Sequence, residues 1–304
     1  MKIKTIAGTS VYIPYEAPIG PYIGRGGLPG TLGARGLIVR VETDAGLIGW
    51  GEGTGAFESD PNVILAGKPV GDIEGALSGL EAAGMGRGPM SGIEMALWDL
   101  LGKAADLPLC LIMGGLVREE ADFCACMGLK EPSESASTAR AYVDRWGFSF
   151  LKTKAGVDAE QDLRIAEAVQ REVGDSAVFR PDANGGYAPE DTESIMRKMH
   201  DLGIRFFEDP CSPKHPDVLA RVRQEVGMGI LVNMGVSIPE GVRPVLEAGA
   251  ADMLMPDTPA SGGLIRVRKI AAIGEAWGVP CLMHCSHDLG LKTAAVTHMA
   301  ASSP

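Results

Sequence analysis

Polar residues at a nearly constant spacing mark the C-terminal part of this 304-residue chain. Each of them follows or closes a short apolar run, and successive members of the series lie 24 to 28 residues apart. Helix-like stretches, such as residues 162–173 (DLRIAEAVQREV), separate the runs. A β-strand and a helix that alternate with this period are typical of a parallel βαβ chain. The series consists of Lys154, Asp182, Glu208, Asn233, Asp257 and His284.

The apolar runs predict the strands of an α/β fold with a TIM-like (β/α) barrel. In such a barrel the carboxyl ends of all the strands surround one mouth, so we expect the polar series to converge there. An eighth strand would have to follow the helical stretch 288–301, but the chain stops at Pro304. We therefore expect a modified barrel that lacks its eighth strand and a chain that is truncated at its C-terminus. The expected strands lie near 123–127 and at 148–151, 177–179, 204–207, 230–232, 253–255 and 280–283.

The first 112 residues have a different pattern. Alternating runs at 36–43 and 45–52 flank Asp44-Ala45-Gly46, which predicts a β-hairpin. A capping box formed by Ser91 and Glu94 predicts the start of a helix. The Gly- and Pro-rich stretch 15–36 is either a surface loop or a mobile flap over a pocket. We predict an α+β capping domain over residues 1–112 and a barrel domain over residues 113–304.

Composition excludes several classes of partner. The net charge is −11 and there is no basic cluster, so we expect neither nucleic acid nor an anionic membrane to bind. No apolar run is long enough to span a bilayer, and the N-terminus lacks the apolar segment of a signal peptide, so we expect a cytoplasmic protein. Residues 281–287 contain two cysteines and two histidines that resemble a zinc cluster, but they lack a CxxC half-site.

The first members of the polar series suggest a base beside a metal site. Lys152 and Lys154 lie two residues apart in an expected strand, so both side chains face the same side. They are either an exposed strand face or a pair of groups at the mouth that includes a base. Asp182 and Glu208 supply carboxylates at adjacent strand ends, and Mg²⁺ prefers such oxygen ligands. The alternative role for each carboxylate is to cap the following helix.

The later members suggest a third ligand and a second proton-transfer group. The amide oxygen of Asn233 is a weaker metal ligand than a carboxylate, but it follows the next strand in the series. Asp257 and His284 close the two strands after that. A carboxylate beside the Nδ1–H of an imidazole fixes the tautomer of the ring and raises its basicity.

Several motifs follow one another in order along nearly the whole chain. They are GLIGWGE (46–52), GIEMALWDLLGKAADLP (92–108) with GG at 114–115, KTK (152–154), DAN (182–184), EDP (208–210), MPD (255–257) with GG at 262–263, and His284. This ordered set resembles the mandelate racemase/muconate lactonising branch of the enolase superfamily, which uses a lysine or histidine base together with Mg²⁺. Most members have Glu or Asp as the third metal ligand, whereas Asn233 and the EDPC motif here resemble the glucarate dehydratase subgroup.

The resemblance implies a role for each site residue. Mg²⁺ would be held by Asp182, Glu208 and Asn233. Lys154 and the His284–Asp257 pair would be acid/base groups on opposite faces of the substrate, and Asp257 in MPD points to the racemase and sugar-acid dehydratase side of the family. Lys152 and Asn184 would hold the substrate carboxylate and its enolate form.

The implied reaction begins with abstraction of the proton α to a carboxylate, which produces an enediolate. We expect dehydration of an acid sugar, an aldonate or aldarate, to a 2-keto-3-deoxy acid. Because Asn233 replaces a carboxylate, the site gains positive charge and should favour a dianionic substrate. Three alternatives stay open: a racemase or epimerase that uses the same intermediate, a metal-binding but inactive member, and an aldolase with Lys154 as a Schiff base. We expect a small carboxylate as the partner and a homo-oligomer of undetermined size.

Overall fold

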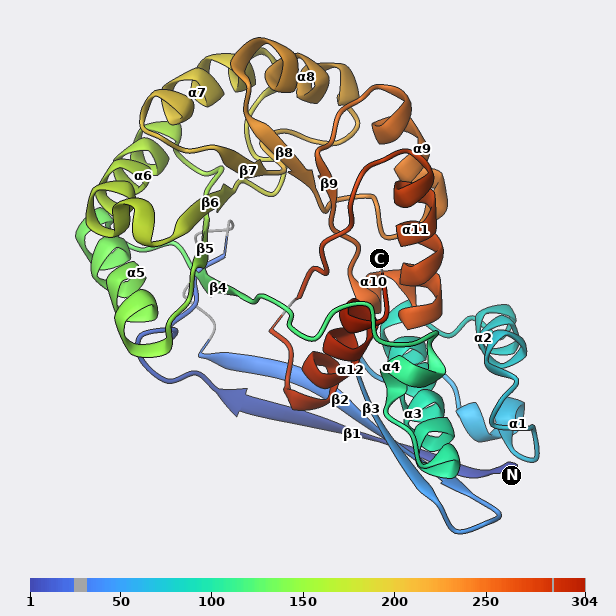
Figure 1. Cartoon of the computed structure of the whole chain (residues 1–304). Helices are drawn as coiled ribbons and strands as arrows, with labels where there is room; N and C mark the ends of the chain where they lie inside the picture. Colours follow the sequence, from blue (N-terminus) through green and yellow to red (C-terminus); the bar gives the residue numbers. More distant parts are fainter. Residues whose placement is uncertain (25–31, 286, 304) are drawn as a thin grey trace.

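The computed structural model describes residues 1–24, 32–285 and 287–303. An antiparallel sheet with its helices lies beneath an arc of parallel strands whose outer side is covered by helices (Figure 1). The antiparallel sheet has the order β1–β2–β3, with β1 at Ile3–Pro14, β2 at Gly33–Thr43 and β3 at Ile48–Gly53. The predicted hairpin is confirmed, because β2 and β3 pair in antiparallel register on either side of residues 44–47. Strand β2 begins at Gly33, so the predicted loop ends earlier than 36, and residues 25–31 of it lie outside the described part.

Helix α3 (Arg87–Ala105) packs against β3 at very short range. A Cβ atom on Gly51 would lie 2.0 Å from the carbonyl oxygen of Gly92, so only glycine fits at this point of the strand. The helix starts four residues before the predicted capping box, and that prediction was wrong. Pro89 has no backbone N–H, and residues in the first turn of a helix do not need one. The helix therefore accommodates Pro89 in its first turn and begins at Arg87, so Ser91 lies inside it. The other helices of this part are α1 (Pro61–Leu65), α2 (Ile73–Ala82) and α4 (Leu109–Ile112).

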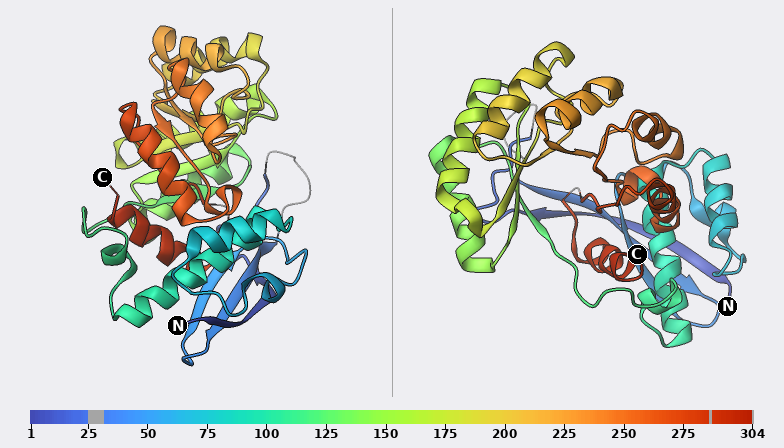
Figure 2. Two further views of the ribbon diagram at one scale, coloured as in Figure 1. Left: turned by 90° about the vertical axis from the view of Figure 1, so that its right-hand side faces the viewer. Right: turned by 45° about the horizontal axis from the view of Figure 1, so that its top comes forward.

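The second sheet contains six parallel strands in sequence order, as the periodic apolar runs predict. Its helices lie on the outside of the curved sheet (Figures 1 and 2), and a continuous apolar core fills the space between them. The strands are β4 (Cys124–Met127), β5 (Phe150–Lys154), β6 (Val178–Asp182), β7 (Phe206–Glu208), β8 (Gly229–Val232) and β9 (Met253–Leu254). The helices are α5 (Pro132–Trp146), α6 (Ala159–Val173), α7 (Pro189–Asp201), α8 (Pro216–Arg221), α9 (Pro239–Glu247), α10 (Thr258–Ser261) and α11 (Leu264–Ala276). A 3₁₀ turn (Gly174–Ser176) and a π-helical turn (Val222–Val226) follow α6 and α8.

The expected strand at 280–283 is not a regular strand. It runs parallel to the β9 segment and pairs with it at two isolated positions, Leu254 with Cys281 and Asp257 with His284. Pro280 has no N–H to donate, and β9 itself is only two residues long, so a continuous ladder does not form. Helix α12 (Gly290–Ala301) then packs against the N-terminal part. Within the described residues β4 and β9 are the edges of the sheet, and the long cavity described below lies beside β4. None of the described helices has the length and apolar character needed to cross a bilayer.

Candidate active site

The register of the parallel sheet brings the first half of the polar series together. Lys154 lies beside Asp182 on the neighbouring strand, and Asp182 lies beside Glu208 on the next one. Each of these residues is the last of its strand, so all three side chains are at the same edge of the sheet. Asn233 comes directly after β8. The side chains of Asp182 and Glu208 are fully buried.

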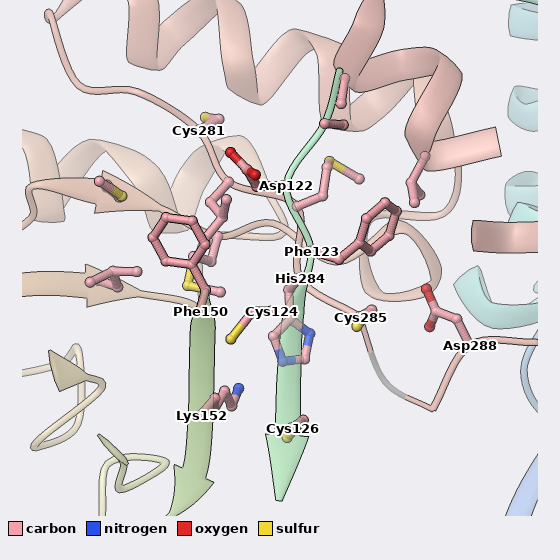
Figure 3. Close-up of a pocket in the computed structure, with 18 of the residues that line it drawn as sticks. Asp122, Phe123, Cys124, Cys126, Phe150, Lys152, Cys281, His284, Cys285 and Asp288 are labelled. Atoms are coloured by element: carbon pink, nitrogen blue, oxygen red, sulfur yellow. The ribbon is translucent and has the colours of Figure 1, made fainter. Parts of the chain in front are cut away.

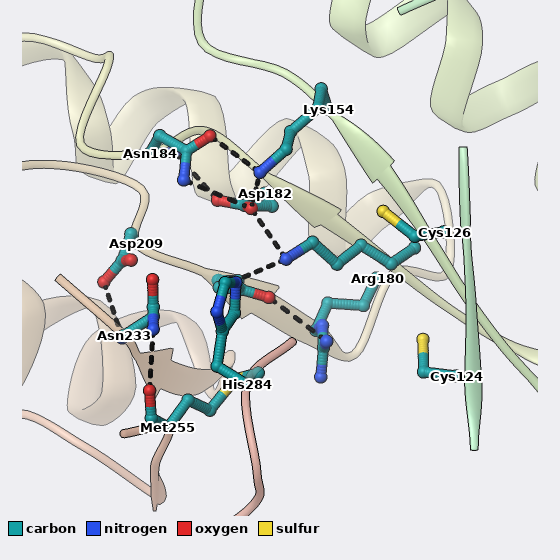
Figure 4. A network of polar contacts seen from close by, with 12 residues as sticks. Cys124, Cys126, Lys154, Arg180, Asp182, Asn184, Asp209, Asn233, Met255 and His284 are labelled. Carbon is teal, nitrogen blue, oxygen red and sulfur yellow. Dashed lines mark hydrogen bonds and ion pairs between the residues drawn. The ribbon is translucent and has the colours of Figure 1, made fainter. Parts of the chain in front are cut away.

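Two lysine ammonium groups neutralise the two buried carboxylates (Figure 4). The Nζ of Lys152 lies 2.9 Å from Asp182 Oδ2 and 2.8 Å from Glu208 Oε1. The Nζ of Lys154 lies 2.6 Å from Asp182 Oδ2. Burial alone would raise the pKa of Asp182, but the two ammonium groups hold it well below its usual range. Burial would likewise lower the pKa of Lys152, but Glu208 and Asp182 raise it above its usual value, so this lysine is a fixed cation.

Asn184 holds the lysine and the carboxylate in place. Its Oδ1 accepts a hydrogen bond of 2.9 Å from Lys154, and its Nδ2 donates one of 3.3 Å to Asp182. Its backbone N–H donates to the second oxygen of Asp182 at 2.9 Å. Asn184 has a φ of 45°, in the left-handed region that asparagine tolerates better than most residues. The DAN motif is therefore a compact turn that presents carboxylate and amide to the same lysine.

His284 and Asp257 form the expected pair at the other end of the site. The Nδ1 atom of His284 lies 3.0 Å from Asp257 Oδ2, and its Nε2 lies 3.9 Å from Glu208 Oε1. Asp257 also caps α10, because its Oδ1 accepts the backbone N–H of Ala260. Burial would raise the pKa of Asp257, but the hydrogen bond from His284 and the charge of Lys292 lower it below its usual value. With Nδ1 directed to Asp257, the Nε2 atom of His284 faces Glu208 and the interior of the site.

The donor set fits a hard divalent cation. Asp182, Glu208 and Asp209 each offer a carboxylate oxygen, and these oxygens lie within 4.8 Å of one another. Glu208 Oε2 is buried and accepts no hydrogen bond among the described residues, although Arg180 Nη2 lies 3.1 Å away. A buried carboxylate oxygen left in this state is a suitable position for a metal ligand.

The third ligand position has two candidates. Asn233 donates its amide N–H to the carbonyl oxygen of Met255 at 2.7 Å, which orients its Oδ1 away from Met255. Asp209 accepts the backbone N–H groups of Asn233 and Met234, so its carboxylate already serves the loop after β8. Burial and the charges of Glu208 and Asp182 raise its pKa well above the usual value. The amide of Asn233 therefore stays our candidate ligand.

Sequence reasoning assigned no role to Arg180 or Asp209. Arg180 lies two residues before Asp182, so strand periodicity places both side chains on the same face of β6. Its guanidinium is buried and pairs with Glu208, which makes it a third cation of the cluster. Asp209 follows Glu208 in the EDP motif, where its φ of 41° turns the chain and directs its carboxylate to the next loop. Strand alternation was the signal for Arg180; local sequence gave none for Asp209.

A cavity of about 1400 Å³ adjoins the polar cluster. Lys152 and His284 line it together with four cysteines from β4 and the 281–285 segment (Figure 3), and Lys154 lines it as well. All six cysteines of the chain carry free thiols. Tyr15 and Tyr22, from the Gly- and Pro-rich stretch that we predicted to be either a surface loop or a flap, line the same cavity. The Tyr15 hydroxyl hydrogen-bonds to Nδ1 of His287, and the Tyr22 ring lies edge-on to that imidazole at 4.5 Å. Burial raises the pKa of Tyr15 to about 12, so the hydroxyl stays protonated.

Comparison with known proteins relates this site to a family. Residues 30–114 match the pattern described as "Mandelate racemase / muconate lactonizing enzyme, N-terminal domain", and residues 134–304 match "Enolase C-terminal domain-like". The chain is 29% identical to the L-Ala-D/L-Glu epimerase of Bacillus subtilis, over 99% of this chain and 86% of that protein. The solved structure of that epimerase in a substrate-liganded complex superimposes with a TM-score of 0.89 and covers 100% of this chain and 88% of the other, at 28% identity.

Two further relatives catalyse other reactions. The D-galactarolactone cycloisomerase of Agrobacterium fabrum is 31% identical, over 88% of this chain and 75% of that protein. The D-xylonate dehydratase of Haloferax volcanii is 29% identical, over 88% of this chain and 73% of that protein. The matched patterns and these relatives show that the chain belongs to the mandelate racemase/muconate lactonizing enzyme family of the enolase superfamily and is an enzyme of the lyase or racemase/epimerase kind.

Proposed function

We propose that this protein abstracts the proton α to a carboxylate and that it dehydrates an acid sugar to a 2-keto-3-deoxy acid with the help of Mg²⁺. One observation carries the proposal. Two groups able to transfer protons, Lys154 and His284, contact opposite ends of a buried pair of carboxylates. A bound Mg²⁺ would supply a Lewis acid that stabilises negative charge on the substrate carboxylate. Asp182, Glu208 and Asn233 are the residues that would hold it.

The first chemical step uses the lysine end of the site. Lys154, which must enter this step as the free amine, takes the α-proton on its Nζ and becomes an ammonium group, and the C–H electron pair becomes the carbon–carbon double bond of the enediolate. Lys152 is buried and stays charged, so its N–H groups stabilise the developing negative charge on the substrate oxygens. Asn184 orients Lys154 through its amide oxygen. These steps require that the substrate carboxylate lies against Lys152 and that its α-carbon faces the Nζ of Lys154.

The second step uses the histidine end. His284, as an imidazolium held by Asp257, protonates the β-hydroxyl group as it leaves, and the enediolate electrons expel it as water. The resulting enol then tautomerises to the 2-keto-3-deoxy acid. The pairing of His284 with Asp257 supports this proposal because the carboxylate orients the imidazole that delivers the proton. The similarity to a D-xylonate dehydratase supports it as well.

Epimerisation is the second candidate, because the chain is also similar to an L-Ala-D/L-Glu epimerase. In that reaction His284 would return a proton to the same carbon from the opposite face. Both reactions share the enediolate, so the residues that stabilise it are the same. We also propose a domain division at residue 112, a small carboxylate as the partner, and a homo-oligomer in the cytoplasm.

Proton NMR in D₂O with Mg²⁺ tests the function directly. The protein is incubated with mono- and diacid sugars and with dipeptides, beside the variants Lys154→Met and His284→Asn and the surface control Lys198→Met. A new 3-deoxy methylene signal establishes the dehydratase, and deuterium wash-in without elimination establishes the epimerase. In a separate incubation with a carbonyl substrate, trapping of an adduct at Lys154 by borohydride would instead support the aldolase alternative. Loss of the α-proton that persists in both Lys154→Met and His284→Asn would contradict the mechanism.

A further inference from the structure

Two buried carboxylates of the N-terminal part cap helices of the barrel. Glu94 on α3 accepts the backbone N–H of Leu264 at 2.7 Å and that of Ile265 at 2.9 Å, in the first turn of α11. Glu52 on β3 accepts the backbone N–H of Leu289 at 2.7 Å and that of Lys292 at 2.9 Å, at the start of α12. Gly263 and Leu289, which precede these helices, have no polar side chain to serve as a cap. The caps are therefore supplied from a different part of the chain.

Each capped helix follows one member of the histidine–aspartate pair. Asp257 begins α10, and after Gly262 and Gly263 the chain enters α11. A Cβ atom on Gly263 would lie 2.7 Å from the Oε2 atom of Glu94, so the turn at Gly262 and Gly263 is packed directly against this carboxylate. The position of Asp257 is thus linked to Glu94 through one short helix and a glycine pair.

The same arrangement holds for His284. Only four residues separate it from Leu289, the first residue that Glu52 holds. Asp288 forms a buried ion pair with Lys292 in the first turn of α12. A Cβ atom on Gly36 of β2 would lie 2.8 Å from the Leu289 side chain, so the start of α12 is packed against the N-terminal sheet. The position of His284 is thus linked to Glu52.

The capping carboxylates are rigid supports. Glu94 is fully buried and its Oε1 also accepts the indole N–H of Trp98 at 2.8 Å, while Glu52 is 3% exposed. The lysine end of the site has different support, because β5 is held on both sides by the ladders to β4 and β6. Among the described residues, the two segments that carry Asp257 and His284 pair with each other only at isolated positions. The two ends of the site therefore depend on different parts of the molecule.

We propose that Glu52 and Glu94 are positioning residues for the His284–Asp257 pair: by capping α12 and α11 from the N-terminal part, they set the distance and orientation of the imidazole relative to its carboxylate. The catalytic meaning of this arrangement rests on the proposed function, because it assigns proton transfer to His284. The geometric claim does not depend on any substrate. Loss of either cap should disturb the pair and leave Lys152 and Lys154 in place.

Nitrogen NMR of the histidine rings tests the geometric claim in the full chain. The protein is labelled with ¹⁵N at its five histidines, and the His284 signals are assigned by their loss in His284→Asn. At one fixed pH above the usual histidine pKa, a neutral ring bound to Asp257 shows a protonated Nδ1 and an unprotonated Nε2. The variants are Glu52→Ala and Glu94→Ala, with Glu52→Gln and Glu94→Gln, which keep one acceptor oxygen each. The matched control is Glu81→Gln, because Glu81 also contacts α11, through an exposed ion pair with Arg266, without capping it.

We expect the two ring signals of His284 to move toward each other in the Ala variants, to a smaller extent in the Gln variants, and not at all in Glu81→Gln. If the Ala variants do not fold, the Gln variants decide the question. Wild-type His284 signals in folded Ala or Gln variants would overturn the proposal. With a substrate found in the D₂O assay, the rate of the His284-dependent step should fall about tenfold in the Ala variants. The rate of α-proton exchange through Lys154 should stay within about twofold of wild type. If the protein turns over no substrate, the His284 ring signals still test the geometric claim. A failure of the proposed function can therefore be told apart from a failure of this proposal.

Discussion

Replacing Lys152 with methionine should destabilise the metal-free protein and increase its response to Mg²⁺. The Lys152 side chain is 7% exposed, and its ammonium lies within 2.9 Å of oxygens of both Asp182 and Glu208. Methionine has a similar length but no charge, so the change leaves two fully buried carboxylates with less positive charge around them. A divalent cation on the same oxygens would replace the lost charge.

The magnitude follows from the burial. Removing one partner of a buried ion pair costs about 3–5 kcal/mol. Lys154 and Arg180 still contact the same carboxylates, so we take the lower end, about 3 kcal/mol. For a chain of this size that corresponds to a fall in Tm of about 5 °C. Mg²⁺ at a hundred times its dissociation constant returns about 3 kcal/mol by mass action.

The assay is thermal unfolding of wild type and variant with and without Mg²⁺. The matched control is Lys292→Met, because Lys292 is also a buried lysine in an ion pair but contacts Asp288 instead of the carboxylates of the site. Both variants should lose stability without metal. Mg²⁺ should raise the Tm of Lys292→Met only as much as it raises that of wild type, because the proposed metal ligands are intact in both, and should raise the Tm of Lys152→Met by more. An equal Mg²⁺ response in the two variants would refute the assignment of the metal to Asp182 and Glu208.

Two further predictions concern single side chains. Burial raises the pKa of Glu94 to about 7, from 4.5 in the unfolded chain, so its contribution to stability is present below pH 4.5 and is lost as the pH rises through 7. Over that window the free energy of unfolding of wild type should fall by about 3 kcal/mol relative to that of Glu94→Gln. Urea titrations at pH 5 and 8 measure this; the same change in free energy between the two pH values in both proteins would contradict the prediction. Asn233→Asp should strengthen Mg²⁺ binding, measured by calorimetry, and should shift the substrate preference from diacids toward monoacids in the D₂O assay; an unchanged preference would contradict the link between Asn233 and a dianionic substrate.

Much of the candidate site is predictable because strand ends carry it. Lys154, Asp182 and Glu208 each end a strand, and parallel strands place their ends side by side. Asn184 was expected only from the family resemblance, as a group that holds the substrate, and its hydrogen bond with Lys154 came from the structure. Sequence reasoning failed at Ser91 and Glu94, where a local capping box pattern predicted a helix start, because the helix begins earlier and Glu94 serves a partner that is 170 residues away.

The sequence by itself determined the repeating strand and helix pattern, the hairpin before it, and the order in which polar residues reach the mouth of the barrel. These follow from side-chain periodicity over a few residues, which any single segment carries within itself. Only the tertiary structure decided that Arg180 joins the buried cluster, that residues 280–283 pair with β9 at isolated positions, and that Glu52 and Glu94 cap α12 and α11. Those contacts join residues far apart in the chain. Their free energy depends on how deeply the groups are buried and how close they lie, which a pattern within one segment does not specify.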